Sequence, residues 1–155
     1  MAKQKGTRRG GRRRAFEVLY GLCFCPAADG LRVDEALRLT PRAGSRDTDV
    51  AQGDREDFAT ELVHGVWEHA GKLDGIISDY SRHWKLNRIA RIELTILRLA
   101  MYEMLYRDDI PLKVAINEAV ELAKRFGDDK AKNFINGILD AVAKAVEDGQ
   151  LRIHR

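Results

Sequence analysis

Apolar residues recur at steps of three and four along most of the chain, which is the spacing of one face of an α-helix. The pattern is clear in residues 54–80, where the apolar positions are Phe58, Leu62, Val66, Leu73, Ile76, Ile77 and Tyr80. Gly71 can bend or split this segment. No stretch alternates apolar and polar residues as a half-buried β-strand does. The pattern therefore predicts an all-α protein.

Helix-breaking residues mark the ends of the first elements. A first helix is expected from about residue 12 to residue 25, where Pro26 follows, and a short second helix over residues 33–39. Residues 40–53 contain turn formers and few large apolar groups, which predicts a loop.

The later helices have clearer boundaries. Residues 88–107 are apolar almost all round, which is typical of a helix in the middle of a bundle. Pro111 suits the first turn of the next helix, because the N–H that proline lacks has no partner there. That helix is expected to end at Gly127, which tolerates the left-handed conformation found after many helices. Asp128 or Asp129 then opens a last helix.

Positive charge is concentrated at the N-terminus. The chain of 155 residues has 27 Lys and Arg against 24 Asp and Glu, a net charge of +3. Seven of the basic residues lie in residues 1–14, which contain no acid, so the rest of the chain holds 20 basic against 24 acidic residues. Such a segment suits a phosphate backbone, because each neutralised phosphate releases a condensed counterion. A solvated tail that only aids solubility is the alternative.

Composition also bounds the domain organisation. We expect residues 1–11, rich in Gly and Arg, to be a basic arm that is disordered until bound. Residues 12–155 are expected to form a single all-helical domain, since this length suits one domain. No apolar run approaches the roughly 18 residues of a membrane span.

The cysteines and the N-terminal arginines indicate in which cellular compartment the protein works. Cys23 and Cys25 are too close along the chain to join distant segments, which predicts a reduced, cytoplasmic protein. Arg13 and Arg14 before an apolar stretch also resemble a twin-arginine export signal. Glu17 interrupts the start of that stretch, which favours the cytoplasmic interpretation.

The sequence shows no pattern typical of a catalytic or metal site. His64 and His69 are five residues apart, unlike two ligands at four-residue spacing on one helical face. Gly10 and Gly11 lie among arginines rather than after a strand, so no phosphate-cradling loop is expected. We therefore predict that the protein is not an enzyme and has no cofactor or metal.

Several segments of the C-terminal half follow one another in a distinctive order. They are residues 96–103 (ILRLAMYE), 109–111 (DIP), 114–124 (VAINEAVELAK), 126–127 (FG) and 134–140 (FINGILD). Their order and spacing resemble the NusB family of transcription antitermination factors. Residues 15–20, 61–66 and 73–74 are also similar to that family, so the resemblance covers most of residues 12–146.

The resemblance implies both a fold and a function. The fold would be all-α, with seven helices in two small helical bundles. The function would be to pair with NusE, a protein of the small ribosomal subunit, and to bind the boxA element of nascent RNA. The pair would help the RNA polymerase antitermination complex pass terminators, notably during ribosomal RNA synthesis. The resemblance allows a monomer or a homodimer.

Binding single-stranded RNA needs positive charge along the backbone and planar groups for the bases. In the N-terminal segment, the expected RNA contacts are Lys5, Arg8, Arg9, Arg12, Arg13 and Arg14. By resemblance, a second contact region opens the last helix, at Lys130, Lys132, Asn133 and Phe134. Free N–H groups at a helix N-terminus suit phosphates. Phe134 can stack on a base, or it can be part of the core.

This chain departs from the family at Lys130-Ala131, where an acidic residue followed by serine is often found. The added positive charge would strengthen RNA binding, or the recognised RNA differs.

Two residues are expected to contact NusE. Glu93 in the central helix suits a basic ribosomal protein, and a solvated glutamate is the alternative. Tyr20 is the second expected contact, and a packed aromatic with its hydroxyl satisfied is the alternative.

Two other functions stay open. The chain resembles the NusB-like N-terminal module of ribosomal RNA cytosine methyltransferases, here without catalysis, because no domain with a catalytic cysteine is expected before the end at Arg155. It could also be a purely protein-binding helical module with an inert arm.

Overall fold

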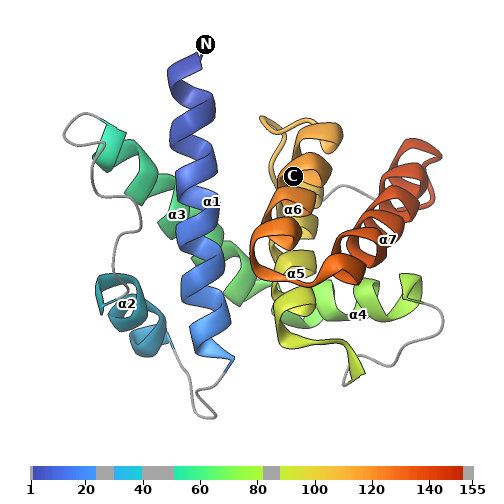
Figure 1. Ribbon diagram of the computed structural model, residues 1–155, viewed down its shortest axis with the longest axis horizontal. Helices are drawn as coiled ribbons and strands as arrows, with labels where there is room; N and C mark the ends of the chain where they lie inside the picture. The colour runs from blue at the N-terminus through green and yellow to red at the C-terminus, as the bar shows by residue number, and fades with distance from the viewer. Residues whose placement is uncertain (1, 24–29, 40–50, 82–87, 152–155) are drawn as a thin grey trace. The chain divides into compact units, whose positions relative to one another are not determined.

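The computed structural model describes residues 2–23, 30–39, 51–81 and 88–151, with only the backbone described for residues 2–7, 30–31 and 51–57. The described residues form seven helices: α1 (Ala2–Leu22), α2 (Gly30–Leu39), α3 (Ala51–Glu68), α4 (Ala70–Tyr80), α5 (Arg91–Tyr106), α6 (Leu112–Phe126) and α7 (Asp129–Glu147) (Figure 1). No strand occurs in the described ranges. The predicted all-α fold of seven helices is confirmed.

The chain divides into two compact units, Met1–Trp67 and Glu68–Arg155. The first unit holds α1, α2 and nearly all of α3, and the second holds α4 to α7. They correspond to the two small helical bundles that the resemblance implies.

The first unit is built on apolar faces of its three helices. Its buried apolar residues are Ala15, Phe16, Val18, Leu19, Leu22, Val33, Leu37, Phe58, Ala59, Leu62, Val63 and Val66. Polar contacts join the helices as well. The Arg14 guanidinium donates to the Leu37 carbonyl near the end of α2, and His64 Nε2 of α3 lies 3.0 Å from Asp34 Oδ1 of α2.

Helix α1 begins at Ala2, well before the predicted start near Arg12. Lys, Gln and Arg are good helix formers, but Gly10 and Gly11 oppose a helix. Tertiary contact offsets this cost, because Gly11 is buried and Arg8 and Arg12 both lie against Phe58 of α3. That residues 1–11 gain order only on binding RNA stays a prediction.

Helix α5 is the centre of the second unit, where it contacts α4, α6 and α7. Its buried residues include Ile96, Leu97, Leu99, Met101 and Leu105, which point in several directions around the helix axis. This explains why residues 88–107 are apolar almost all round, as predicted for a central helix.

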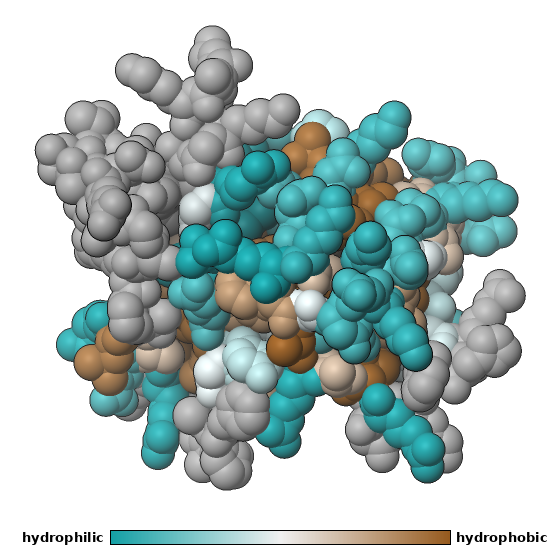
Figure 2. All heavy atoms as spheres, viewed as in Figure 1, coloured by the Kyte–Doolittle hydropathy of each residue, from teal (hydrophilic) through white to brown (hydrophobic). Residues whose placement is uncertain are grey.

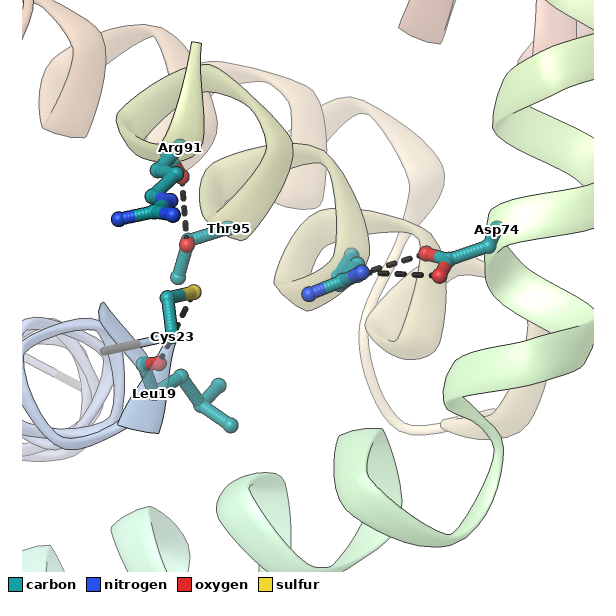
Figure 3. A network of polar contacts seen from close by, with 6 residues as sticks. Leu19, Cys23, Asp74, Arg91 and Thr95 are labelled. Atoms are coloured by element: carbon teal, nitrogen blue, oxygen red, sulfur yellow. Dashed lines mark hydrogen bonds and ion pairs between the residues drawn. The ribbon is translucent and has the colours of Figure 1, made fainter. Parts of the chain in front are cut away.

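A bidentate ion pair fixes α5 to α4. Arg98 Nε and Nη2 donate to the two carboxylate oxygens of Asp74, at 2.6 and 2.8 Å (the dashed lines at Asp74 in Figure 3). Both side chains are about three-quarters buried. Two parallel charged hydrogen bonds of this kind set the orientation of one helix against the other.

The corner between α6 and α7 is tight. Gly127 has φ −101° and ψ −177°, which is extended backbone, so the predicted left-handed conformation is wrong. Glycine is required there for another reason: a Cβ on Gly127 would lie 2.7 Å from Ala131 Cβ and 3.0 Å from the Ala123 carbonyl oxygen. Asp128 then caps α7, as predicted.

The surface is mainly hydrophilic on the face that Figure 2 shows, with apolar residues in small patches between the polar ones. Within the described residues, no helix is long and apolar enough to cross a membrane.

Candidate nucleic-acid interface

The basic residues of α1 point in different directions. Arg8 and Arg12 are one helical turn apart and therefore share a face. Their guanidinium carbons lie 5.3 and 5.4 Å from the centroid of the Phe58 ring in α3, within the distance of a cation–π interaction. Arg12 is only 3% exposed. These two arginines are therefore directed toward the protein.

Arg9 and Arg13 form a second pair at four-residue spacing. Arg9 is exposed, and the Arg13 side chain is 32% exposed. Arg13 Nε lies 3.4 Å from Glu17 Oε1, one turn further along α1. This is a long, partly exposed ion pair, which contributes little to stability. We call Arg9 and Arg13 the outer stripe of α1.

The other two basic residues named in this segment lie apart from the outer stripe or are described less fully. Arg14 donates to the Leu37 carbonyl, so it joins α1 to α2. A cation at this position also complements the negative end of the α2 dipole. Lys5 lies one turn before Arg9 in the register of α1, and only its backbone is described.

The start of α7 presents the second set of predicted RNA contacts. Lys130 and Asn133 are exposed, and Lys132 and Phe134 are partly exposed. Phe134 is thus neither a fully buried core residue nor a fully open ring. Two lysines and an amide within four consecutive positions give this end of α7 hydrogen-bonding and basic side chains, beside the exposed Asp128 and Asp129.

The backbone of α7 is less open than the sequence predicts. Asp128 Oδ1 accepts hydrogen bonds from the backbone N–H groups of Lys130, at 3.0 Å, and Ala131, at 2.9 Å. The expectation of free N–H groups is wrong for these two, because a short aspartate side chain reaches them from the N-cap. A phosphate at this end would have to bind without these two N–H groups.

Glu93, the predicted partner contact, lies in the first turn of α5 and is partly exposed. Its pKa is raised above the ordinary value, first by burial and then by the negative charge of Asp128. Glu93 is thus close enough to Asp128 to be affected by its charge. The fold therefore brings Glu93 near the N-terminus of α7, within the second unit.

Tyr20 packs against a neighbouring aromatic ring of α1. Its ring stacks on that of Phe16, with centroids 5.8 Å apart and an interplanar angle of 11°, and the residue is partly exposed. This geometry fits a packed aromatic, and the residue is not fully buried.

Two features were missed by sequence reasoning. Phe58 was identified only as an apolar position, although it contacts two of the predicted RNA-binding arginines. The second is a stack of three rings. The ring centroids of Tyr102 and Tyr106 lie 5.4 Å apart, and those of His69 and Tyr106 lie 4.1 Å apart. The four-residue spacing of the two tyrosines could have indicated that they meet, but nothing in the sequence places His69 beside them.

Among the side chains that the structure describes, no three His, Cys, Asp or Glu residues are placed to hold a metal ion.

Known proteins are similar to this chain in sequence and in fold. The transcription antitermination protein NusB of Nitratidesulfovibrio vulgaris (strain DSM 19637 / Miyazaki F) is 49% identical over 160 residues, with 97% of each chain covered. The protein of the same name from Bacillus subtilis (strain 168) is 43% identical over 140 residues, which cover 90% of this chain and 97% of that protein.

Solved structures agree with these relatives. NusB of T. maritima superposes with a TM-score of 0.75 at 34% identity, over 93% of this chain and 97% of that one. A structure described as the antitermination factors NusB and NusE in complex with dsRNA matches with a TM-score of 0.70 at 26% identity, over 90% of this chain and 97% of that one. The model of the NusB family matches residues 9–144, and the chain therefore belongs to the NusB family.

Proposed function

We propose that this protein is a transcription antitermination factor that binds RNA together with NusE. The observation that carries this proposal is the outer stripe of α1, Arg9 and Arg13, on a chain that belongs to the NusB family. Relatives about half identical to it are named for antitermination, and a related structure is described as holding NusB, NusE and dsRNA.

In detail, the RNA would be the boxA element of nascent transcripts, and the protein would act in the RNA polymerase antitermination complex on ribosomal RNA operons. It would work in the cytoplasm by binding and not by catalysis. The N. vulgaris relative, matched over 97% of its length, bears an antitermination name, which favours this function over a module of an RNA methyltransferase.

The RNA contacts that we propose come from both units. In α1 they are Arg9 and Arg13, with Lys5 included because it lies one turn before Arg9. In α7 they are Lys130, Lys132, Asn133 and Phe134. The basic side chains would neutralise phosphates, and the partly exposed Phe134 ring would stack on a base. Arg8, Arg12 and Arg14 would support α1 without direct contact to RNA.

For NusE we propose Glu93 as the main contact and the partly exposed Tyr20 as a second one. A basic group of NusE beside Glu93 would offset the repulsion between Glu93 and Asp128 that contributes to the raised pKa of Glu93. Lysine at position 93 would repel the same basic group, so Glu93→Lys should weaken NusE binding more than RNA binding by the protein alone. Equal losses would instead indicate misfolding or a shared surface.

The test of the function is binding of the purified full chain to a short boxA-like RNA and to a scrambled RNA of equal length, with and without NusE. Selective tightening of boxA-like binding by NusE is the expected result. Equal binding of both RNAs with no effect of NusE would contradict the proposal. The mass of the protein in solution, measured in the same buffer, distinguishes a monomer from a homodimer.

A further inference from the structure

One aromatic ring, that of Phe58, contacts two of the arginines of α1 and leaves the others to point elsewhere. Arg8 and Arg12 lie over Phe58, at 5.3 and 5.4 Å from its centroid. Arg9 and Arg13 follow each of them by one position, which rotates their side chains by about 100° around the helix axis. Arg9 is exposed and Arg12 is buried. Holding the first pair therefore determines where the second pair points.

We infer that Phe58 is a positioning residue of the RNA-binding surface: by holding Arg8 and Arg12 against α3, it fixes the rotation of α1 so that the outer stripe of Arg9 and Arg13 faces the RNA. The inference rests on the proposed function, since it assigns the parts of that same surface.

The chemistry of the three side chains suits this role. A guanidinium is planar and weakly hydrated, so it stacks on an aromatic face more readily than an ammonium group does. Like charges one turn apart on a helix repel each other, and a ring shared by both cations offsets part of that repulsion. Phe58 is only 6% exposed, and an interaction shielded from water is stronger than one at the surface.

Arginines of the outer stripe should neutralise phosphates, and arginines held by Phe58 should not. For a single-stranded nucleic acid, each neutralised phosphate contributes about 0.7 to the slope of log affinity against log salt. An arginine of the outer stripe should contribute to that slope. Arg12, at 3% exposure over the Phe58 ring, should not.

The first experiment compares two identical chemical changes three positions apart, Arg9→Met and Arg12→Met. Methionine keeps a long side chain and can contact an aromatic ring through its sulfur, so Arg12→Met retains packing on Phe58. Binding of the full chain to the boxA-like RNA with NusE is measured over a series of salt concentrations. Arg9→Met should lower the magnitude of the slope by about 0.7, and Arg12→Met should leave the slope at the wild-type value.

The second experiment tests the ring itself. Phe58→Tyr keeps an aromatic face, and Phe58→Leu keeps an apolar side chain without one. At a temperature where circular dichroism shows both variants folded, Phe58→Leu should weaken RNA binding several-fold and Phe58→Tyr should restore it close to wild type. If Phe58→Leu does not fold, the comparison of Arg9→Met with Arg12→Met still tests the division of the arginines that the inference requires, and equal slopes would overturn it.

The outcomes separate the inference from the proposed function. If the wild-type protein binds the RNA but Arg9→Met and Arg12→Met lower the slope equally, the division of the arginines by Phe58 is wrong and the function stands. If wild-type binding shows no preference for the boxA-like RNA and no effect of NusE, the proposed function itself fails.

Discussion

At the corner between α6 and α7, the space for a single methyl group decides which residue fits. Gly127→Ala would place a Cβ 2.7 Å from Ala131 Cβ, and overpacking of this kind destabilises a protein by about 1–3 kcal/mol. Urea denaturation should show that loss in the free energy of unfolding. Ala131→Gly removes the opposing methyl group, so Gly127→Ala should be less harmful in that background. Additive losses would mean that the contact is relieved by a shift of the backbone.

Also at the scale of one residue, the raised pKa of Glu93 makes stability depend on pH. Because the folded pKa lies above the ordinary value of 4.5, ionisation of Glu93 disfavours the folded state. This penalty is fully present above the folded pKa and disappears as pH falls through that pKa to 4.5. Glu93→Gln should remove this part of the pH dependence of the unfolding free energy.

The two causes of the Glu93 pKa can be separated by NMR titration of its carboxyl group. Asp128→Asn keeps an N-cap for α7 and removes the neighbouring charge. The Glu93 pKa should then fall toward 4.5 but stay above it, because burial is the larger cause. A pKa unchanged by Asp128→Asn would show that the two carboxylates do not interact.

At the scale of helices, the ion pair between α4 and α5 should matter more than pairs within one helix. Arg98→Met removes two charged hydrogen bonds between side chains about three-quarters buried, which should cost about 1–3 kcal/mol of unfolding free energy. Lys124→Met is the control, since its pair with Glu121 is half exposed and within α6. That change should cost less than about 0.5 kcal/mol. Similar losses for both would contradict a role for Arg98 in joining the helices.

Local signals predicted the helices whose boundaries depend on nearby residues. The apolar positions of α5, the proline before α6 and the aspartate cap of α7 all act within a few residues of the boundary they set. The start of α1 did not follow from local signals, because glycines oppose a helix there and Phe58, which offsets them, lies in another helix. The conformation of Gly127 was predicted wrongly for the same reason, since the contact that requires glycine is with Ala131 in α7.

For the candidate site, the sequence predicted which segments carry basic and aromatic residues. It could not predict which of these side chains the fold buries and which it exposes. All six cations named in the N-terminal segment were predicted to contact RNA. In the structure, Arg12 is buried, Arg14 donates to a carbonyl and Arg9 is exposed. Helical periodicity gives the angle between such residues, but only the position of α3 shows which direction is inward.

At the scale of the whole molecule, the proposed division of the arginines should set the salt dependence of RNA binding. The proposed phosphate contacts are Lys5, Arg9, Arg13, Lys130 and Lys132, which for a single strand give a slope of about −3.5. If Arg8, Arg12 and Arg14 also bound phosphates, the slope would be about −5.6. The affinity of the protein alone for the boxA-like RNA, measured over a tenfold range of salt, separates these values. A slope near the larger magnitude would mean that RNA draws all three arginines away from the Phe58 ring and the Leu37 carbonyl, so that α1 changes its contacts with α2 and α3 on binding.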